Sequence, residues 1–281
     1  MLKGSFHYRM SSHLQTRRIE SEHYIFDVFR MTDKSGILFA SDKEVKDLIK
    51  CPDFIPFAAA YHGDKKLWKD TSGKADMTPD FFSEEYESMI EFMRVDDHAC
   101  VNEKGKVVNP AASEDSKKFN ELVKSGLLED YPNAGIIVTS DTRLPTLEDH
   151  NYQWYKSNFK RVVEEHISKI PTYRKNHPEC KHLAFLIFDE SCGYFEVESI
   201  PEEFKEGTPC LGKPHFWFMD DTFTKVFTKS EVDCVIWFTP YKFAESRFVP
   251  GGLPVVSVFF KSEGEWKTIT YDESHMMPAE V

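Results

Sequence analysis

The spacing of apolar residues divides the chain into segments with helical periodicity and segments typical of strands. Tyr155, Phe159 and Val163 share one face at roughly 100° per residue, which predicts an amphipathic helix. This helix is expected to begin at Thr146, which has capping-box spacing, and to end or kink at Pro171.

Continuous apolar runs, typical of strands, follow this helix. The predicted strands are 182–189, 193–199, 215–227, 233–243, 255–260 and 265–272. A long helix followed by a mixed, mostly antiparallel sheet is an α+β pattern. We therefore expect the C-terminal half to be an α+β domain, residues 111–281.

The preceding part reads as a smaller α+β region, residues 1–110. Its pattern predicts a hairpin of strands 23–31 and 36–40, a short helix at 41–50 with a Ser41–Glu44 capping box, a helix over 78–94 with Pro79 in its first turn, and a long loop over 95–112. A helix closed by Gly126 and a buried strand at 134–140 come next. Residues 51–63 are apolar and fit either a strand or a helix.

Composition narrows the possible functions. The 281 residues include 24 Phe and carry a net charge of −12, so a packed core is expected and the whole molecule would repel nucleic acid and anionic membranes. No signal-peptide-like segment and no apolar run of about 18 residues occurs, and the six cysteines are scattered. These features predict a cytoplasmic protein with reduced thiols and no membrane span.

The stretch IFDESCGYFEVES, residues 187–199, carries the most specific chemical pattern. It reads as a strand ending on Asp189, a tight turn, and a second strand on which Glu196 and Glu198 share one face. Three converging carboxylates repel one another unless a hard divalent cation compensates their charge. The pattern therefore predicts a site for Mg²⁺ or Mn²⁺.

Asp189, followed after residues 190–195 by Glu196-Val197-Glu198, resembles the core motif of the PD-(D/E)xK, or restriction-endonuclease-like, nucleases. Glu198 stands where most of that family has Lys, so the resemblance is to its Glu-x-Glu variant. The resemblance implies a metal-dependent nucleic-acid phosphodiester hydrolase, with Asp189 and Glu196 as metal ligands and Glu198 orienting or deprotonating the attacking water. Lys242 is the candidate for stabilising charge in the transition state.

A nucleic-acid substrate requires a locally basic surface on this acidic protein. Residues 151–182 contain seven Lys and Arg against three Glu. The candidate phosphate contacts are Lys156, Lys160, Arg161, Arg174 and Lys175. The pattern does not distinguish DNA from RNA and does not bear on the oligomeric state.

Other interpretations of the same residues stay open. The carboxylates could form an ordinary solvated face, or serve a hydrolase acting on another substrate. The acidic surface would suit a non-enzymatic protein-binding or regulatory protein of microbial or mobile-element type. His177, Cys180 and His182, with Cys192, are weaker zinc candidates. His166 reads as a hydrogen-bonded core histidine.

Overall fold

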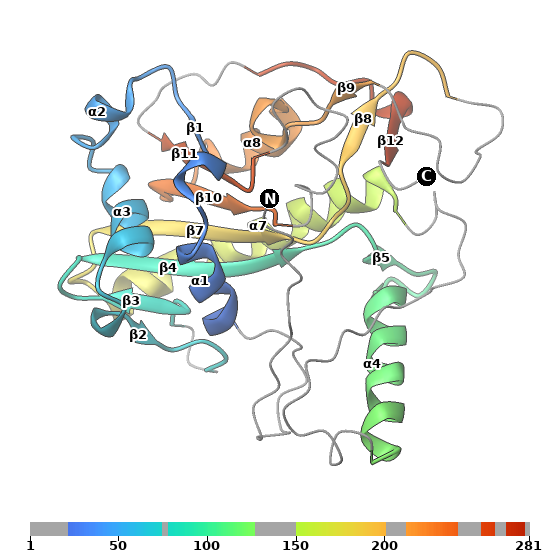
Figure 1. Ribbon diagram of the computed structural model, residues 1–281, viewed down its shortest axis with the longest axis horizontal. Coiled ribbons are helices and arrows are strands. Elements are labelled where there is room, and N and C mark those ends of the chain that lie inside the picture. Colours follow the sequence, from blue (N-terminus) through green and yellow to red (C-terminus); the bar gives the residue numbers. More distant parts are fainter. Residues whose placement is uncertain are drawn as a thin grey trace.

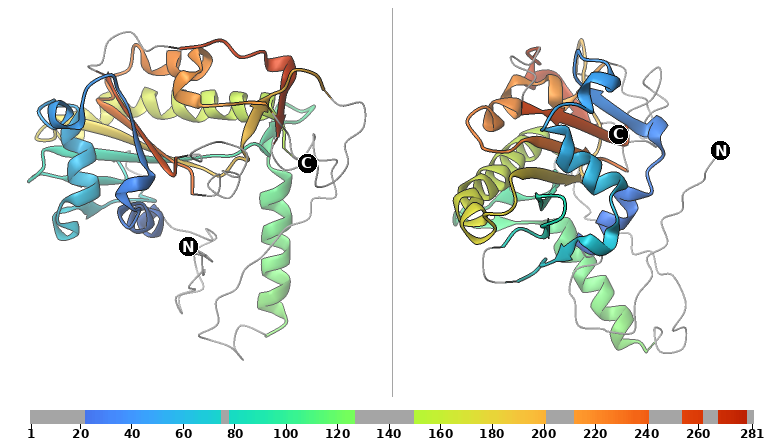
Figure 2. Two further views of the ribbon diagram at one scale, coloured as in Figure 1. Left: turned by 45° about the horizontal axis from the view of Figure 1, so that its top comes forward. Right: turned by 90° about the vertical axis from the view of Figure 1, so that its left-hand side faces the viewer.

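The computed structural model describes residues 22–74, 78–126, 150–200, 212–240, 254–261 and 268–278. These residues form three layers, in which one mixed sheet is covered by helices on both faces (Figures 1 and 2). In this described part, no helix is both long and apolar enough to cross a membrane.

The central sheet has seven strands. In spatial order they are β1 (Ile37–Ala40), β11 (Val256–Phe260), β10 (Cys234–Phe238), β7 (His182–Asp189), β4 (Ser88–Val95), β3 (Phe81–Ser83) and β2 (Lys69–Asp70). β4, β7 and β10 run parallel to one another, so their carboxyl ends meet at one edge of the sheet. β11 pairs antiparallel with β10 and parallel with β1, while β2, β3 and β4 form an antiparallel meander. Strands from both sides of residue 110 thus share one sheet.

Both faces of the sheet are apolar because helices cover both. Helix α7 (Tyr152–Asn176) packs on one face, and α1 (Glu22–Arg30) and α3 (Phe54–His62) pack on the other. β4 shows the alternation, since Met89 and Met93 belong to the core under α7 whereas Ile90 and Phe92 belong to the core under α1 and α3. Figure 2 shows the two helical layers on opposite sides of the strands.

Smaller elements complete the described structure. The remaining helices are α2 (Val45–Leu48), α4 (Pro110–Lys124) and α8 (Asp221–Thr224), with 3-10 turns η1 (Lys34–Gly36), η2 (Lys65–Leu67), η3 (Trp217–Met219), η4 (Lys225–Phe227) and η7 (Glu273–His275). β8 (Tyr194–Glu196) lies between β12 (Met276–Pro278) and β9 (Lys213–Pro214) in a second sheet, and β5 (Cys100–Val101) pairs with β6 (Val107–Val108). Helix α4 projects away from the three layers (Figures 1 and 2).

Several sequence predictions are confirmed. The class is α+β, and the apolar runs at 182–189, 233–243 and 255–260 contain β7, β10 and β11. A helix ends before Gly126, whose φ of +73° is the left-handed conformation that glycine adopts at helix ends. The long helix α7 also exists, although it begins at Tyr152, after the extended cap residue Asn151, rather than at Thr146, and it continues through Pro171 to Asn176. Pro171 has no N–H, so α7 lacks the hydrogen bond to the Ile167 carbonyl at this point and continues nonetheless.

Two N-terminal predictions are wrong. Residues 23–31 form helix α1 rather than a strand, because Ile25, Phe26 and Phe29 lie on one helical face and bury it against the sheet. Residues 78–94 form β3 and β4 rather than a helix. β4 is buried on both faces, which removes the polar alternation that identifies a strand in sequence.

The C-terminal sheet also differs from the prediction. β7 pairs with β4 and β10, whereas β8 pairs with β9 and β12, so residues 187–199 do not form a hairpin. Residues 215–227 are mostly helical turns rather than a strand. The Ser41–Glu44 capping box is absent, since Ser41 Oγ accepts from Lys43 N instead. Thr146 and the predicted strand 134–140 lie outside the described residues.

Candidate metal centre

Asp189 is a buried structural carboxylate with four hydrogen-bond donors. Its Oδ2 accepts from Tyr155 Oη at 2.8 Å and Trp237 Nε1 at 2.9 Å. Its Oδ1 accepts from the backbone N and Oγ of Ser191 at 2.9 and 2.6 Å. The side chain is fully buried, and these donors occupy both of its oxygens.

The other residues of the predicted catalytic set lie elsewhere. Glu196 forms an ion pair with Lys213 at 2.9 Å and accepts from the backbone N of Asp272 at 3.2 Å. Glu198 is exposed beyond the end of β8. Lys242 lies outside the described residues. β8 belongs to the second sheet and not to the central one. The structure therefore does not bring Asp189, Glu196 and Glu198 together as a group of possible metal ligands.

A different group meets the geometric requirement. Within the described ranges, the one set of three His, Cys, Asp or Glu side chains with ligand atoms within 4.8 Å of one another is Asp97, His98 and His150. Asp97 and His98 follow the carboxyl end of β4, and His150 stands just before α7. The parallel edge of the sheet and the start of its covering helix therefore meet at this group.

Local hydrogen bonds hold both parts of the site. Asp96 Oδ1 accepts from the backbone N–H groups of His98 and Ala99, which folds the chain into a tight turn directly after β4. The Asp96 carbonyl also accepts from Asn158 Nδ2 of α7 at 3.2 Å, which ties the turn to the helix. Asn151 caps α7 by accepting from the N–H groups of Gln153 and Trp154. This cap fixes the backbone next to His150, which directly precedes Asn151 in the chain.

The two oxygens of Asp97 have different surroundings. Oδ2 accepts from His150 Nδ1 at 3.1 Å, Cys192 N at 3.1 Å and Tyr194 Oη at 2.7 Å. Oδ1 lies 3.5 Å from His98 Nε2 but is buried without a hydrogen-bond partner. A buried carboxylate oxygen without a partner is costly, and a bound cation would satisfy it.

The charges of this group favour an ionised aspartate. Burial by itself raises the pKa of Asp97, but the hydrogen bond from His150 and the charges of His150 and His98 outweigh burial and lower this pKa to about 2. The Asp97 side chain is fully buried, whereas the side chains of His98 and His150 are 20% and 15% exposed. The group is thus closed behind the carboxylate and reaches solvent beside the imidazoles.

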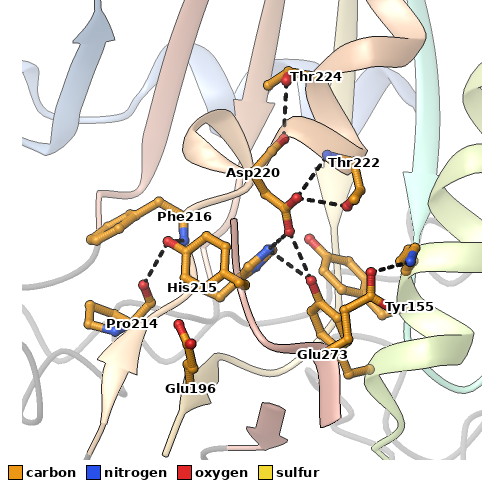
Figure 3. Close-up of polar contacts among 12 residues, drawn as sticks. Tyr155, Glu196, Pro214, His215, Phe216, Asp220, Thr222, Thr224 and Glu273 are labelled. Carbon is orange, nitrogen blue, oxygen red and sulfur yellow. Dashed lines mark hydrogen bonds and ion pairs between the residues drawn. The ribbon is translucent and has the colours of Figure 1, made fainter. Parts of the chain in front are cut away.

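A second buried aspartate–histidine pair is fully satisfied. Asp220 Oδ2 accepts from Tyr152 Oη and lies 2.9 Å from His215 Nε2, while Oδ1 accepts from the N and Oγ1 of Thr222 at the start of α8 (Figure 3). Burial alone raises the pKa of Asp220, but its bonds to His215 and Thr222 lower it to about 2. Asp220 therefore joins α7, α8 and the β9 segment as a structural residue.

Carboxylates accompany most of the predicted nucleic-acid contacts. Lys156 pairs with Glu273, Lys160 with Glu164, Arg161 with Glu165, and Arg174 with Asp233, while Lys175 is exposed. These pairs reduce the net positive charge that α7 presents. The structure thus offers less basic surface than the count along the sequence indicates.

The structure also places the other histidines singled out in the sequence. His166 Nδ1 contacts the buried Glu91, as expected of a hydrogen-bonded core histidine. His177, Cys180 and His182 are not among the described groups of possible metal ligands. Cys192 donates its backbone N–H to Asp97 Oδ2.

The sequence pattern did not single out Asp97, His98 and His150. The first two lie in a segment assigned to a loop, and His150 is 53 positions from Asp97. A usable signal was present, because Asp-Asp-His directly follows the strand that ends at Val95. That signal was hidden by the prediction of a helix over 78–94.

Comparison with known proteins adds no further constraint. No protein-family model matches this chain, and no significant match was found among curated proteins or solved structures.

Proposed function

We propose that this protein is a metal-dependent hydrolase whose metal is bound by Asp97, His98 and His150. The observation that carries the proposal is the fully buried Asp97, whose Oδ1 has no hydrogen-bond partner and faces an imidazole nitrogen. Three protein ligands leave at least one coordination position for water, which is the arrangement of catalytic rather than structural sites.

The ligand types select the metal. Two imidazoles and one carboxylate suit Zn²⁺, Mn²⁺ or Fe²⁺, whereas Mg²⁺ prefers oxygen ligands and retains several waters. Of the two ions expected from the sequence, the site therefore favours Mn²⁺ over Mg²⁺, and Zn²⁺ joins it as a candidate. The bound ion would lower the pKa of its water and polarise the bond to be cleaved.

Nucleic-acid phosphodiesters are the proposed substrate class. The support is helix α7, whose first turn adjoins His150 and whose Lys and Arg outnumber its Glu, although carboxylates pair with most of the predicted contacts.

Metal binding is the first test. We expect calorimetric titration with Zn²⁺ or Mn²⁺ to show one site in the wild type, and at least tenfold weaker binding in Asp97→Asn and His98→Ala. His166→Ala is the matched control, since it also removes a partly buried imidazole paired with a buried carboxylate, yet lies outside the group. Equal affinity in His98→Ala and wild type would contradict the assignment.

Hydrolysis is the second test. Single- and double-stranded DNA and RNA are incubated with each metal-loaded protein, and cleavage is expected in the wild type and in His166→Ala. Asp97→Asn should lower the rate by at least about 100-fold, since it removes a ligand to the ion that activates water. A protein that binds the ion but cleaves none of these substrates would retain the metal site and refute the nuclease proposal.

A further inference from the structure

Asp97 Oδ2 is surrounded by donors on the side away from His98. The Tyr194 hydroxyl and the Cys192 N–H both donate to it, at 2.7 and 3.1 Å, and His150 Nδ1 lies at 3.1 Å. A histidine that ligates a metal must lose its proton from the coordinating nitrogen. If His150 coordinates through Nδ1, that nitrogen no longer donates to Oδ2, and two donors remain for the two lone pairs of Oδ2.

We propose that Tyr194 is a positioning residue that makes Asp97 coordinate the metal through Oδ1 alone. The inference rests on the metal site proposed above and explains how its carboxylate would be oriented. With Oδ2 saturated by Tyr194 and Cys192, only Oδ1 has free lone pairs, and it is the oxygen that faces His98. One-oxygen coordination keeps the ligand number low and leaves room for water.

Tyr194 is rigid enough for this role. Its side chain is 2% exposed, and its ring stacks on Tyr155 with centroids 5.6 Å apart and planes at 15°. Its backbone belongs to β8, where it pairs with Pro278 of β12.

Tyr155 provides a matched control for Tyr194. Both are buried tyrosines whose hydroxyls donate to a buried aspartate, at 2.8 Å for Tyr155 and 2.7 Å for Tyr194. The acceptor of Tyr155 is Asp189, which is outside the metal group. Tyr155→Phe therefore removes a hydrogen bond from a buried tyrosine hydroxyl to a buried aspartate, as Tyr194→Phe does, and it does so within the same pair of stacked rings. It leaves every donor to Asp97 unchanged.

The test is a Co²⁺ titration of the full chain, followed by calorimetry and by visible absorption, in wild type, Tyr194→Phe and Tyr155→Phe. Tyr194→Phe should bind Co²⁺ about 10- to 100-fold more weakly. Its visible bands should also be weaker, because a second carboxylate oxygen that joins the ion raises the coordination number. Tyr155→Phe should retain the wild-type affinity and spectrum, and circular dichroism should show both variants folded.

Two results would overturn the inference while the metal site stands. One is a Tyr194→Phe protein with the affinity and spectrum of the wild type. The other is an equal loss in both variants, which would indicate general loosening of the tyrosine stack. A wild-type protein that binds no Co²⁺, Zn²⁺ or Mn²⁺ would instead refute the proposed function, and the role of Tyr194 with it.

Discussion

Replacing Asp189 with Asn should destabilise the fold without affecting metal binding. An amide has one acceptor oxygen and one NH₂ donor, whereas the Asp189 carboxylate accepts on both oxygens. If the NH₂ group replaces Oδ2, it faces the N–H of Trp237, and if it replaces Oδ1, it faces the backbone N–H of Ser191. Neither N–H group can turn to accept a hydrogen bond, so one buried donor loses its partner in either orientation.

The expected loss follows from these contacts. A buried donor without a partner costs about 1–3 kcal/mol, and bonds to a charged acceptor are stronger than those to a neutral amide. We therefore expect Asp189→Asn to lower the free energy of unfolding by about 3 kcal/mol. Asp189→Ala would remove all four hydrogen bonds, and its cost would approach the whole free energy of unfolding of a typical domain, about 5–15 kcal/mol. Asp189→Asn is the more informative change because the variant should still fold.

Urea unfolding followed by tryptophan fluorescence measures the effect, since Trp237 is fully buried. Asp221→Asn is the control because it makes the same chemical change at a partly exposed carboxylate paired with Lys225, where about 0–1 kcal/mol is expected. A folded Asp189→Asn protein that unfolds at the wild-type urea concentration but loses metal binding would refute the reasoning. That result would restore Asp189 as a metal ligand.

Three further predictions concern stability. The depressed pKa of Asp220 contributes about 2 kcal/mol to the free energy of unfolding, which is present above about pH 4 and lost as the pH falls towards 2. In urea unfolding, the stability of Asp220→Asn should therefore fall less than that of the wild type between pH 5 and pH 2.5. Asn151→Ala should cost about 1 kcal/mol by removing the α7 cap, and a thermal melt as stable as wild type would disprove this. Gly63→Ala should cost about 1–3 kcal/mol in the same assay, because its Cβ would lie 2.4 Å from the Ala59 carbonyl and 2.8 Å from the Tyr86 ring; an unchanged midpoint would contradict that geometry.

The stretch 187–199, which the sequence pattern singled out, lies next to Asp97 in the structure. It supplies the N–H of Cys192 and the hydroxyl of Tyr194 as donors to Asp97. The expected convergence of Asp189 with Glu196 assumed that adjacent strands pair. Strand pairing is a long-range choice, and β7 pairs with β4, some ninety positions earlier in the chain.

Local patterning by itself determined the elements with a strong period or a continuous apolar run. Helix α7 and strands β7, β10 and β11 are examples, because burial of one helical stripe or of a whole strand requires those residues wherever the element is placed. The abundance of aromatic residues likewise determined that a large core would form.

Only the tertiary structure decided which charged groups meet and what each one does. Asp97 and His150 are far apart in sequence and come together because parallel strands end at one edge of the sheet, where α7 begins. The same edge encloses Asp189 among four donors and makes it structural. The role of a carboxylate depends on its solvation and its partners, and both are set by contacts between distant segments that no local pattern records.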